Sequence, residues 1–304
     1  MVIAAVALAG QSGGVDATAE AADGIVKTTL DPAGAAAGRL PTMLAMTAIA
    51  LVSLAIAWRR GWLAMPAAAE PSPSPRPNPG PSLVVLAMAV PLLGAIGALI
   101  ARRIFALPES PDLAGQARML AGAAVAQLPA VTAIVLLSAR ARSGPLLATL
   151  LGILACAIAF PVVQTIAGLA GWIQQLVSGV PAPAVAHRTL EGLVASDDAA
   201  ARLGMLVLVV AVIPPIEEVA YRGGFQGGLR RLGWTPWPAT IATSGLFAFM
   251  HVGAIPESGL AAALCGLFAL SIGLGIVRER TGSLVAPAVA HALFNLVNVV
   301  VARG

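Results

Sequence analysis

Two adjacent glutamates and an arginine follow one of the most apolar stretches of this chain. The run LGMLVLVVAVIPP, residues 203–215, leads directly into IEEVAYRGGF, residues 216–225. Glu218 and Arg222 are four residues apart, in the order that favours an ion pair along a helix. Glu217 is displaced by about 100° around such a helix, so the spacing assigns the arginine to Glu218. The two carboxylates are therefore expected to have different roles.

Two of the three histidines lie in other apolar segments. His251 ends the stretch GLFAFMH one helical turn after Phe247, which places an aromatic ring beside an imidazole. His291 lies in PAVAHALFNLV, four residues before Asn295 and on the same helix face. We expect the carboxylate, the two imidazoles and the carboxamide to converge from three helices on one cavity. His187 lies in a loop rich in Pro and Ala and is excluded from this cluster.

Ionisable groups inside a membrane suggest two kinds of chemistry. They can serve as acids and bases, or they can line a path for protons or substrates. Hydrolysis of an amide bond needs a base for the attacking water and donors directed at the developing negative charge. A walled cavity of low dielectric strengthens both effects. The residue types in this cluster satisfy these needs without a serine or cysteine nucleophile.

The composition indicates that membrane helices position this cluster. Of the 304 residues, 58% are hydrophobic and 11% are charged, whereas about 25% are charged in soluble domains. The mean hydropathy is +0.89. The net charge of +4 comes from arginines at the ends of apolar runs, and no basic patch interleaved with aromatic residues suggests a nucleic-acid partner. The chain is predicted to be an integral membrane protein with the lipid bilayer as its surroundings.

Eight apolar runs are long enough to cross a bilayer as helices, because lipid offers no partner to an open backbone. The predicted fold is an all-α, polytopic transmembrane bundle of about eight spans. The fifth helix should run from about Val207 to Leu229, through Pro214 and Pro215, with its centre near Glu218. A charge at that depth costs about 2.5 to 3.5 kcal/mol, so these carboxylates should face a protein interior. The spans are 41–58, 83–101, 119–139, 145–171 and four that begin near Leu203, Trp237, Gly259 and Leu284, the last ending near Ala302.

The chain is expected to have three parts. Residues 1–39 should be poorly ordered, because residues 11–39 are small, polar and acidic. Residues 40–144 should hold the N-terminal transmembrane helices, with an extended Pro-rich linker at 66–82. Residues 145–304 should form the membrane domain that carries the polar cluster. Residues 1–10 resemble a short signal-peptide core without a basic start, so both interpretations of them stay open.

The arginines predict an orientation in the membrane. If the N-terminus is outside the cytoplasm, four arginine groups fall on the cytoplasmic side and one falls outside. Both termini would then be extracytoplasmic. The composition is rich in Ala and Arg and poor in Lys, which suggests a bacterial cytoplasmic membrane. The cytoplasmic groups are Arg59 and Arg60, Arg140 and Arg142, Arg230 and Arg231, and Arg278 and Arg280, and the outer group is Arg102 and Arg103.

Three motifs resemble the CAAX protease and bacteriocin-processing (CPBP) family of membrane endopeptidases. EEVAYR is similar to its EExxxR element, FAFMH to FxxxH and HALFN to HxxxN, in the family's order, over roughly residues 145–302. The resemblance implies that Glu217 is a general base that activates water with help from His251. It implies that His291 and Asn295 stabilise the oxyanion of the tetrahedral intermediate. The orienting or structural residues that it implies are Glu218, Arg222 and Phe247.

The resemblance leaves the cofactor open between no metal and zinc. Glu217, His251 and His291 form a ligand set that catalytic zinc uses. Against zinc, the chain has no HExxH motif, which would place two ligands on one helix. We expect a glutamate mechanism without a cofactor, with zinc as the alternative.

The expected function is that of an integral-membrane endopeptidase that cleaves a peptide bond at or within the bilayer. Its partner would be a peptide or protein substrate, either lipid-modified or bound to the membrane. The alternative is a membrane transporter or immunity-type binding protein without catalytic activity, in which the same polar residues line a path or hold helices together. The complete set of motifs favours the enzyme, as does the lack of the paired broken helices typical of inverted-repeat transporters.

Overall fold

The structure is a computed structural model that describes residues 32–66, 78–138, 143–179 and 188–302. These ranges contain helices and no strand, which confirms the all-α fold. Residues 1–31 of the N-terminal segment, most of the Pro-rich linker and His187 lie outside them. The helices are α2 (Pro32–Arg59), α3 (Gly80–Ile104), α4 (Leu113–Leu137), α5 (Pro145–Ser178), α6 (Arg188–Ala195), α7 (Ala199–Val207), α8 (Ile213–Glu218), α9 (Gly227–Arg231), α10 (Pro236–Phe249), α11 (Leu260–Thr281) and α12 (Val285–Val301).

Six helical segments in the described residues are long and apolar enough to cross a membrane, as a polytopic fold requires. Two of the eight predicted spans are shorter than expected. Helix α10 has 14 residues and α12 has 17, whereas about 20 residues are needed to cross the hydrocarbon core. The expectation of about eight spans is thus refined to six full-length helices and two shorter apolar helices. The described chain also contains α6, a short helix that was expected to be loop.

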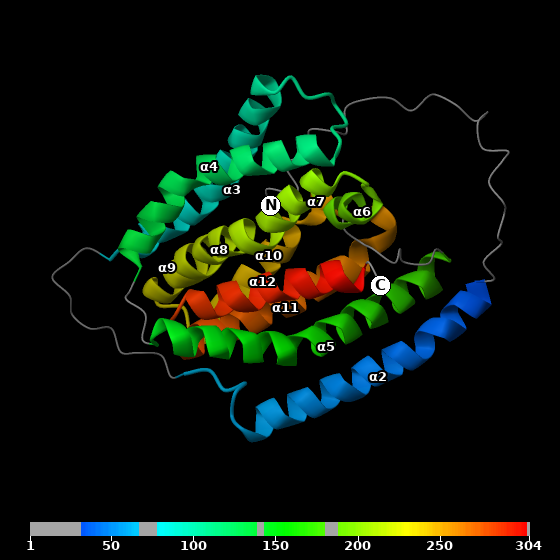
Figure 1. The fold of residues 1–304 in the computed structure, drawn as a ribbon. Coiled ribbons are helices and arrows are strands. Elements are labelled where there is room, and N and C mark those ends of the chain that lie inside the picture. The colour runs from blue at the N-terminus through cyan, green and yellow to red at the C-terminus, as the bar shows by residue number, and fades with distance from the viewer. Residues whose placement is uncertain (1–31, 67–77, 139–142, 180–187, 303–304) are drawn as a thin grey trace.

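One long helical segment, Ala199–Arg231, lies in the middle of the bundle. It joins α7, α8 and α9 through two π-helical turns, η1 (Leu208–Val212) and η2 (Val219–Gln226). Figure 1 shows α3 and α4 paired on one side of this central helix, with α10 to α12 on the other. Helix α5 packs against α11 and α12, and α2 packs along the outer side of α5. The central helix is therefore covered by protein on both sides.

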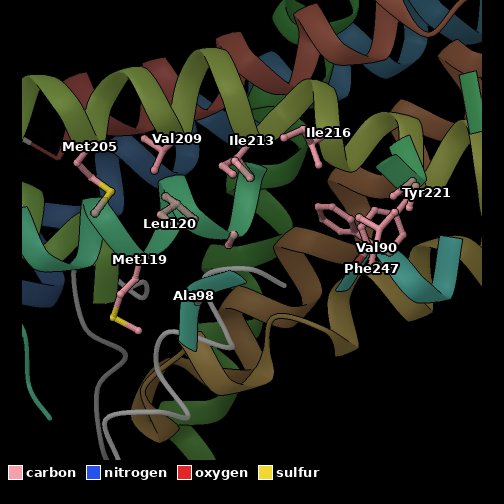
Figure 2. Packing of buried hydrophobic residues seen from close by; sticks show 14 of the residues in the cluster. Val90, Ala98, Met119, Leu120, Met205, Val209, Ile213, Ile216, Tyr221 and Phe247 are labelled. Atoms are coloured by element: carbon pink, nitrogen blue, oxygen red, sulfur yellow. The ribbon is translucent and has the colours of Figure 1, made fainter. Parts of the chain in front are cut away.

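An apolar stripe fixes the rotation of the central helix. Its members recur every three or four residues, which places them on one face. Figure 2 shows this stripe packed against α4 at Met119 and Leu120. Glu217 and Glu218 follow directly after Ile216, the last residue of the stripe. The stripe consists of Met205, Val209, Ile213 and Ile216, all buried.

The central helix passes through Pro214 and Pro215 without a break, as expected. A proline has no N–H, and its ring clashes with the carbonyl four residues earlier, so it normally kinks or ends a helix. Here the π turn η1 precedes the prolines, and the N–H of Ile213 bonds the carbonyl of Leu208, five residues back. The next carbonyl, that of Val209, would require an N–H from Pro214 in the same pattern. It therefore needs a donor from elsewhere.

Two glycines let α3 approach the central helix closely. A Cβ atom on Gly224 would lie 2.7 Å from the Cβ atom of Ala87, and one on Gly228 would lie 2.9 Å from the carbonyl oxygen of Gly80. Real Cβ atoms essentially never come so close to other atoms. Small residues at such positions allow van der Waals packing between membrane helices. The close contact brings α3 to the same stretch of central helix that carries the glutamates.

Most of the described arginine groups gather at one end of the bundle. Arg280, at the end of α11, donates to the carbonyl of Gly61, just after α2, at 2.8 Å. Arg230, at the end of α9, pairs with Glu279 at 3.3 Å. Arg102 and Arg103 lie at the end of α3, whose N-terminus is bound to the end of α9 by a hydrogen bond from Asn78 to the carbonyl of Arg231. The two arginines of α3 are thus at the opposite end of the bundle.

Candidate active site

Glu218 and Arg222 form a fully buried ion pair. Arg222 Nε lies 3.1 Å from Glu218 Oε2, and neither side chain is exposed. Arg222 Nη2 also donates to the hydroxyl of Ser271 on α11 at 2.8 Å and to its carbonyl at 3.1 Å. The ring of Phe247 lies 5.1 Å from the guanidinium carbon, within the range of a cation–π contact. The local pairing predicted from the spacing is therefore present, and it is anchored to two further helices.

His291 on α12 contacts both glutamates. Its Nδ1 lies 2.9 Å from Glu218 Oε1, and its Nε2 lies 3.8 Å from Glu217 Oε2. A carboxylate only accepts hydrogen bonds, so Nδ1 carries a proton and donates to Glu218. The opposite edge of the ring, Nε2, therefore faces Glu217. His291 links the carboxylate held by Arg222 to the one beside it.

Glu217 lines a small cavity between α3, α4 and the central helix. Its side chain is buried, with 6% of the residue exposed. The cavity has a volume of about 20 Å³, and a single water needs at least about 10 to 15 Å³ on this measure. Most of its wall is apolar, including Val90, Ile216 and Ala220, and Tyr221 and Gln127 also line it. Glu217 thus contacts the α12 histidine and also borders a space of the size of one water.

His251 lies directly after α10 and is oriented by its own helix end. Its Nδ1 is 2.7 Å from the carbonyl oxygen of Phe247. Because a carbonyl only accepts, Nδ1 donates, and in the neutral ring Nε2 is then an acceptor. The Phe247 ring lies 4.6 Å from the His251 ring and 5.8 Å from the His291 ring, between centroids. The predicted contact of Phe247 with His251 is present, and this phenylalanine also joins the two histidines.

Tyr221 completes the aromatic wall of the cluster. It is buried, and its ring meets that of Phe247 edge-on at 5.1 Å. Figure 2 shows these two rings together with Val90 near the end of the apolar stripe. The burial of Tyr221 shows that it packs inside the bundle instead of anchoring the chain at the membrane surface.

Asn295 lies one turn from His291 on α12 and bonds the central helix. Its Nδ2 donates to the carbonyl of Val209 at 2.8 Å. This is the carbonyl that Pro214 leaves without a backbone donor. Asn295 therefore supplies the hydrogen bond that the proline removes, and it ties α12 to η1. One of its two amide hydrogens makes this bond.

Two polar residues near this cluster were not anticipated from the sequence. Ser271 binds Arg222, and Gln127 lines the cavity beside Glu217. Each is a single polar residue inside an apolar run. A polar group in such a position has to find a partner in the protein interior, and this signal would have identified both residues.

Among the described residues, no three His, Cys, Asp or Glu side chains are arranged so that they could hold a metal ion. The zinc ligand set of Glu217, His251 and His291 stays a prediction, because a histidine that binds a metal usually donates its other ring N–H to a carboxylate or a backbone carbonyl, as Nδ1 of His291 and Nδ1 of His251 do.

The comparison with protein families agrees with this geometry. Residues 199–297 match the family described as type II CAAX prenyl endopeptidase Rce1-like. The matched segment contains the two glutamates, Arg222, both histidines and Asn295. No curated protein and no solved structure shows significant similarity to the chain. Over residues 199–297, the chain is therefore similar to the membrane endopeptidases of the CAAX protease family.

Proposed function

We propose that this protein hydrolyses a peptide bond at or within the bilayer by means of a water molecule that Glu217 activates. The observation that carries the proposal is the different surroundings of the two adjacent carboxylates. Glu218 is held by Arg222 and by His291 Nδ1. Glu217 borders the cavity and faces His291 Nε2. These surroundings support a role for Glu218 in orienting His291 and a role for Glu217 in activating water.

In the proposed reaction, Glu217 acts first as a base and then as an acid. Glu217 takes a proton from the water as the water oxygen forms a bond with the carbonyl carbon of the substrate. The tetrahedral intermediate then collapses, the C–N bond breaks, and the leaving nitrogen takes the proton back from Glu217. The products are a carboxylic acid and an amine, which ionise to a carboxylate and an ammonium group, and the enzyme returns to its starting state. Nε2 of His251, an acceptor in the neutral ring, helps to orient the water.

The donors for the oxyanion come from α12. His291 donates through Nε2 when the ring carries both protons, and Asn295 donates through the amide hydrogen that does not bond Val209. Two donors from one helix, one turn apart, would surround the oxygen that gains charge. Removal of one such donor typically lowers kcat by about 10²- to 10³-fold.

The substrate is proposed to be a peptide that lies in or on the membrane. The name of the matched family points to prenylated C-terminal sequences as the first probe. We therefore propose two fluorogenic peptides that differ only in whether the cysteine of a C-terminal CAAX sequence is farnesylated. Cleavage of one or both by protein in liposomes would define whether the lipid group is needed.

The decisive variant is Glu217→Gln, which keeps the size of the side chain and removes the base. We expect kcat to fall by about 10²- to 10⁴-fold. Glu257→Gln is the matched control, because Glu257 is exposed and does not line the cavity beside Glu217. It should cleave at the rate of the unmodified protein. Cleavage by Glu217→Gln at that same rate would overturn the proposed role of Glu217.

Metal analysis tests the proposed lack of a cofactor. The protein should keep its activity after treatment with a chelator, and its metal content should not follow its activity. Zinc in a stoichiometric amount, lost together with activity, would contradict this part of the proposal. Whether or not a metal is present, His291→Ala should lose turnover and still bind the peptide. Measuring kcat and peptide binding for this variant therefore distinguishes a role in catalysis from a role in binding.

A further inference from the structure

Gln127 is a buried polar residue on α4, outside the segment that matches the family. Only 1% of it is exposed, and it lies in the wall of the same cavity as Glu217. It therefore reaches the candidate active site from the N-terminal half of the chain. Its surroundings there are mainly apolar, with Val90, Ile216 and Ala220 among the lining residues.

The carboxamide oxygen of Gln127 has no hydrogen-bond partner among the described residues. This oxygen, Oε1, is nevertheless buried. A buried side-chain oxygen normally has a partner, and one without a partner calls for an explanation. A second observation points in the same direction, since this oxygen belongs to a residue in the wall of a cavity where a ligand could supply the missing donor.

A peptide substrate brings the groups that Gln127 lacks. To be cleaved inside a membrane, a segment must be extended around the scissile bond, so its backbone N–H and C=O groups lose their helical partners. Lipid cannot satisfy them, and the enzyme has to do so. A carboxamide has one acceptor oxygen and two donor hydrogens, which match the C=O and N–H groups of a peptide backbone.

We propose that Gln127 binds the backbone of the peptide substrate, with Oε1 accepting an N–H close to the scissile bond. The inference rests on the proposed function, because it requires the backbone of a peptide substrate to approach Gln127 at the wall of this cavity. Binding satisfies two polar groups at once, one on the enzyme and one on the substrate. Gln127 recognises the backbone and not a side chain, so it favours an extended peptide of any sequence over one that stays helical. Helices α3 and α4 then form one wall of the substrate site.

The first test compares Gln127→Leu with Gln116→Leu in the peptide cleavage assay. Gln116 is on the same helix and bonds the carbonyl of Pro111, so it controls for the loss of a glutamine from α4. We expect kcat/KM of Gln127→Leu to fall by about 5- to 100-fold, since the substrate amide is left unpaired. Gln116→Leu should change it by less than about twofold, in line with a position outside the site.

The second test identifies the partner group on the substrate. The probes are a series of peptides in which one backbone N–H near the scissile bond is replaced by an ester oxygen, with the scissile bond itself unchanged. One of these esters should be cleaved poorly by the unmodified protein, and the same ester should show no further loss with Gln127→Leu. Equal losses from Gln127→Leu on every probe, esters included, would contradict a direct hydrogen bond.

The thermal stability of Gln127→Leu separates substrate binding from a structural role. Because Oε1 has no partner among the described residues, an apolar side chain of similar size should leave the midpoint of unfolding unchanged or raise it. A lower midpoint together with lower activity would mean that Gln127 supports the fold, and would overturn the proposal.

The inference can fail independently of the proposed function. Unchanged kcat/KM of Gln127→Leu, in a protein that Glu217→Gln inactivates, overturns the role of Gln127 alone. Unchanged cleavage by Glu217→Gln overturns the proposed function. Where turnover is too slow to measure, binding of the fluorescent peptide tests the inference instead. The two proteins to compare are Glu217→Gln and the double variant Glu217→Gln with Gln127→Leu. Equal binding by the two proteins would also contradict the inference.

Discussion

At the scale of single residues, two neighbouring glutamates are given different chemistry by their surroundings. Both are buried, but Glu218 is enclosed by a guanidinium and an imidazole, whereas Glu217 borders a cavity. A buried charge is tolerable only where it is paired and hydrogen-bonded. Both carboxylates contact His291, but only Glu218 also supplies the countercharge of Arg222, which gives it an additional structural role.

This difference predicts unequal effects of the same substitution at the two positions. Glu218→Gln leaves the guanidinium of Arg222 buried without its countercharge, so the free energy of unfolding should fall by about 3 to 5 kcal/mol. Glu217→Gln should lower it by less, because Glu217 lies 3.8 Å from His291 Nε2 and its neutralisation leaves no guanidinium buried without its countercharge. Unfolding in mixed micelles, followed by circular dichroism, measures both values. Equal losses at the two positions would show that the carboxylates are not specialised in this way.

The residue spacing predicted only the contacts that one helix makes with itself. The pair of Glu218 with Arg222 and the contact of Phe247 with His251 both follow from one helical turn. The bonds of His291 to Glu218 and of Arg222 to Ser271 join different helices. They depend on the depth and rotation of α11 and α12 relative to the central helix, which a single sequence does not encode in its spacing.

At the scale of elements, the central helix combines two prolines, two π-helical turns and the candidate site. π-Helical turns are rare and occur frequently at functional sites. The first turn accommodates Pro214 and Pro215, and the second contains Tyr221 and Arg222. The local cost of the prolines is a carbonyl without a backbone donor, and Asn295 on α12 supplies that donor. A carbonyl left without a backbone donor in one helix thus binds a side chain of another helix.

This link predicts that substitutions at Asn295 and Pro214 are coupled. Asn295→Leu should lower the free energy of unfolding by about 1 to 3 kcal/mol, because the carbonyl of Val209 is left buried and unpaired. Pro214→Ala restores a backbone N–H, so in its presence the loss from Asn295→Leu should be smaller by more than about 0.5 kcal/mol. A double-mutant cycle gives this interaction energy. Strict additivity would mean that the proline and the asparagine act separately.

Hydropathy predicted which segments are helical better than it predicted their length. All eight apolar runs contain helices, but α10 and α12 are too short to count as full spans. Helix α10 ends at Phe249 and the chain turns at His251, so that the imidazole lies at a helix end and not within a helix. Composition could not show this, because the residues on both sides of the turn are apolar. The amphipathic α6 was missed because its eight residues lie in a polar stretch.

At the scale of the whole molecule, the N-terminal helices and the family-like segment build one site. The sequence motifs lie within residues 199–297, but the cavity beside Glu217 is also lined by α3 and α4. Close packing at Gly224 and Gly228 holds α3 against the central helix. No motif in residues 40–144 predicted this contribution, since apolar helices with small residues pack in many ways. The division of the chain near residue 144 stays a prediction.

The distribution of arginines predicts how the bundle lies in the membrane. The end that holds Arg230 and Arg280 should face the cytoplasm, since positive residues accumulate there. Two single-cysteine variants report which side each end of the bundle faces. Ser110→Cys lies in the loop after α3, and Thr235→Cys lies in the loop after α9. Both carry Cys265→Ser, because Cys265 is exposed and would react with the label. Both positions are exposed. An impermeant maleimide should label Ser110→Cys on intact cells and Thr235→Cys only after permeabilisation. The reverse pattern would invert the topology.

The origin of the oxygen in the product tests the proposed role of Glu217 most directly. If Glu217 activates water, then a single turnover in water labelled with heavy oxygen should place one labelled atom in the new carboxylate of almost every product molecule. The same experiment with Glu217→Gln should yield almost no product. A first turnover that gives unlabelled product, followed by labelled product in later turnovers, would mean that a protein carboxylate attacks the peptide itself, and would contradict the activation of water by Glu217.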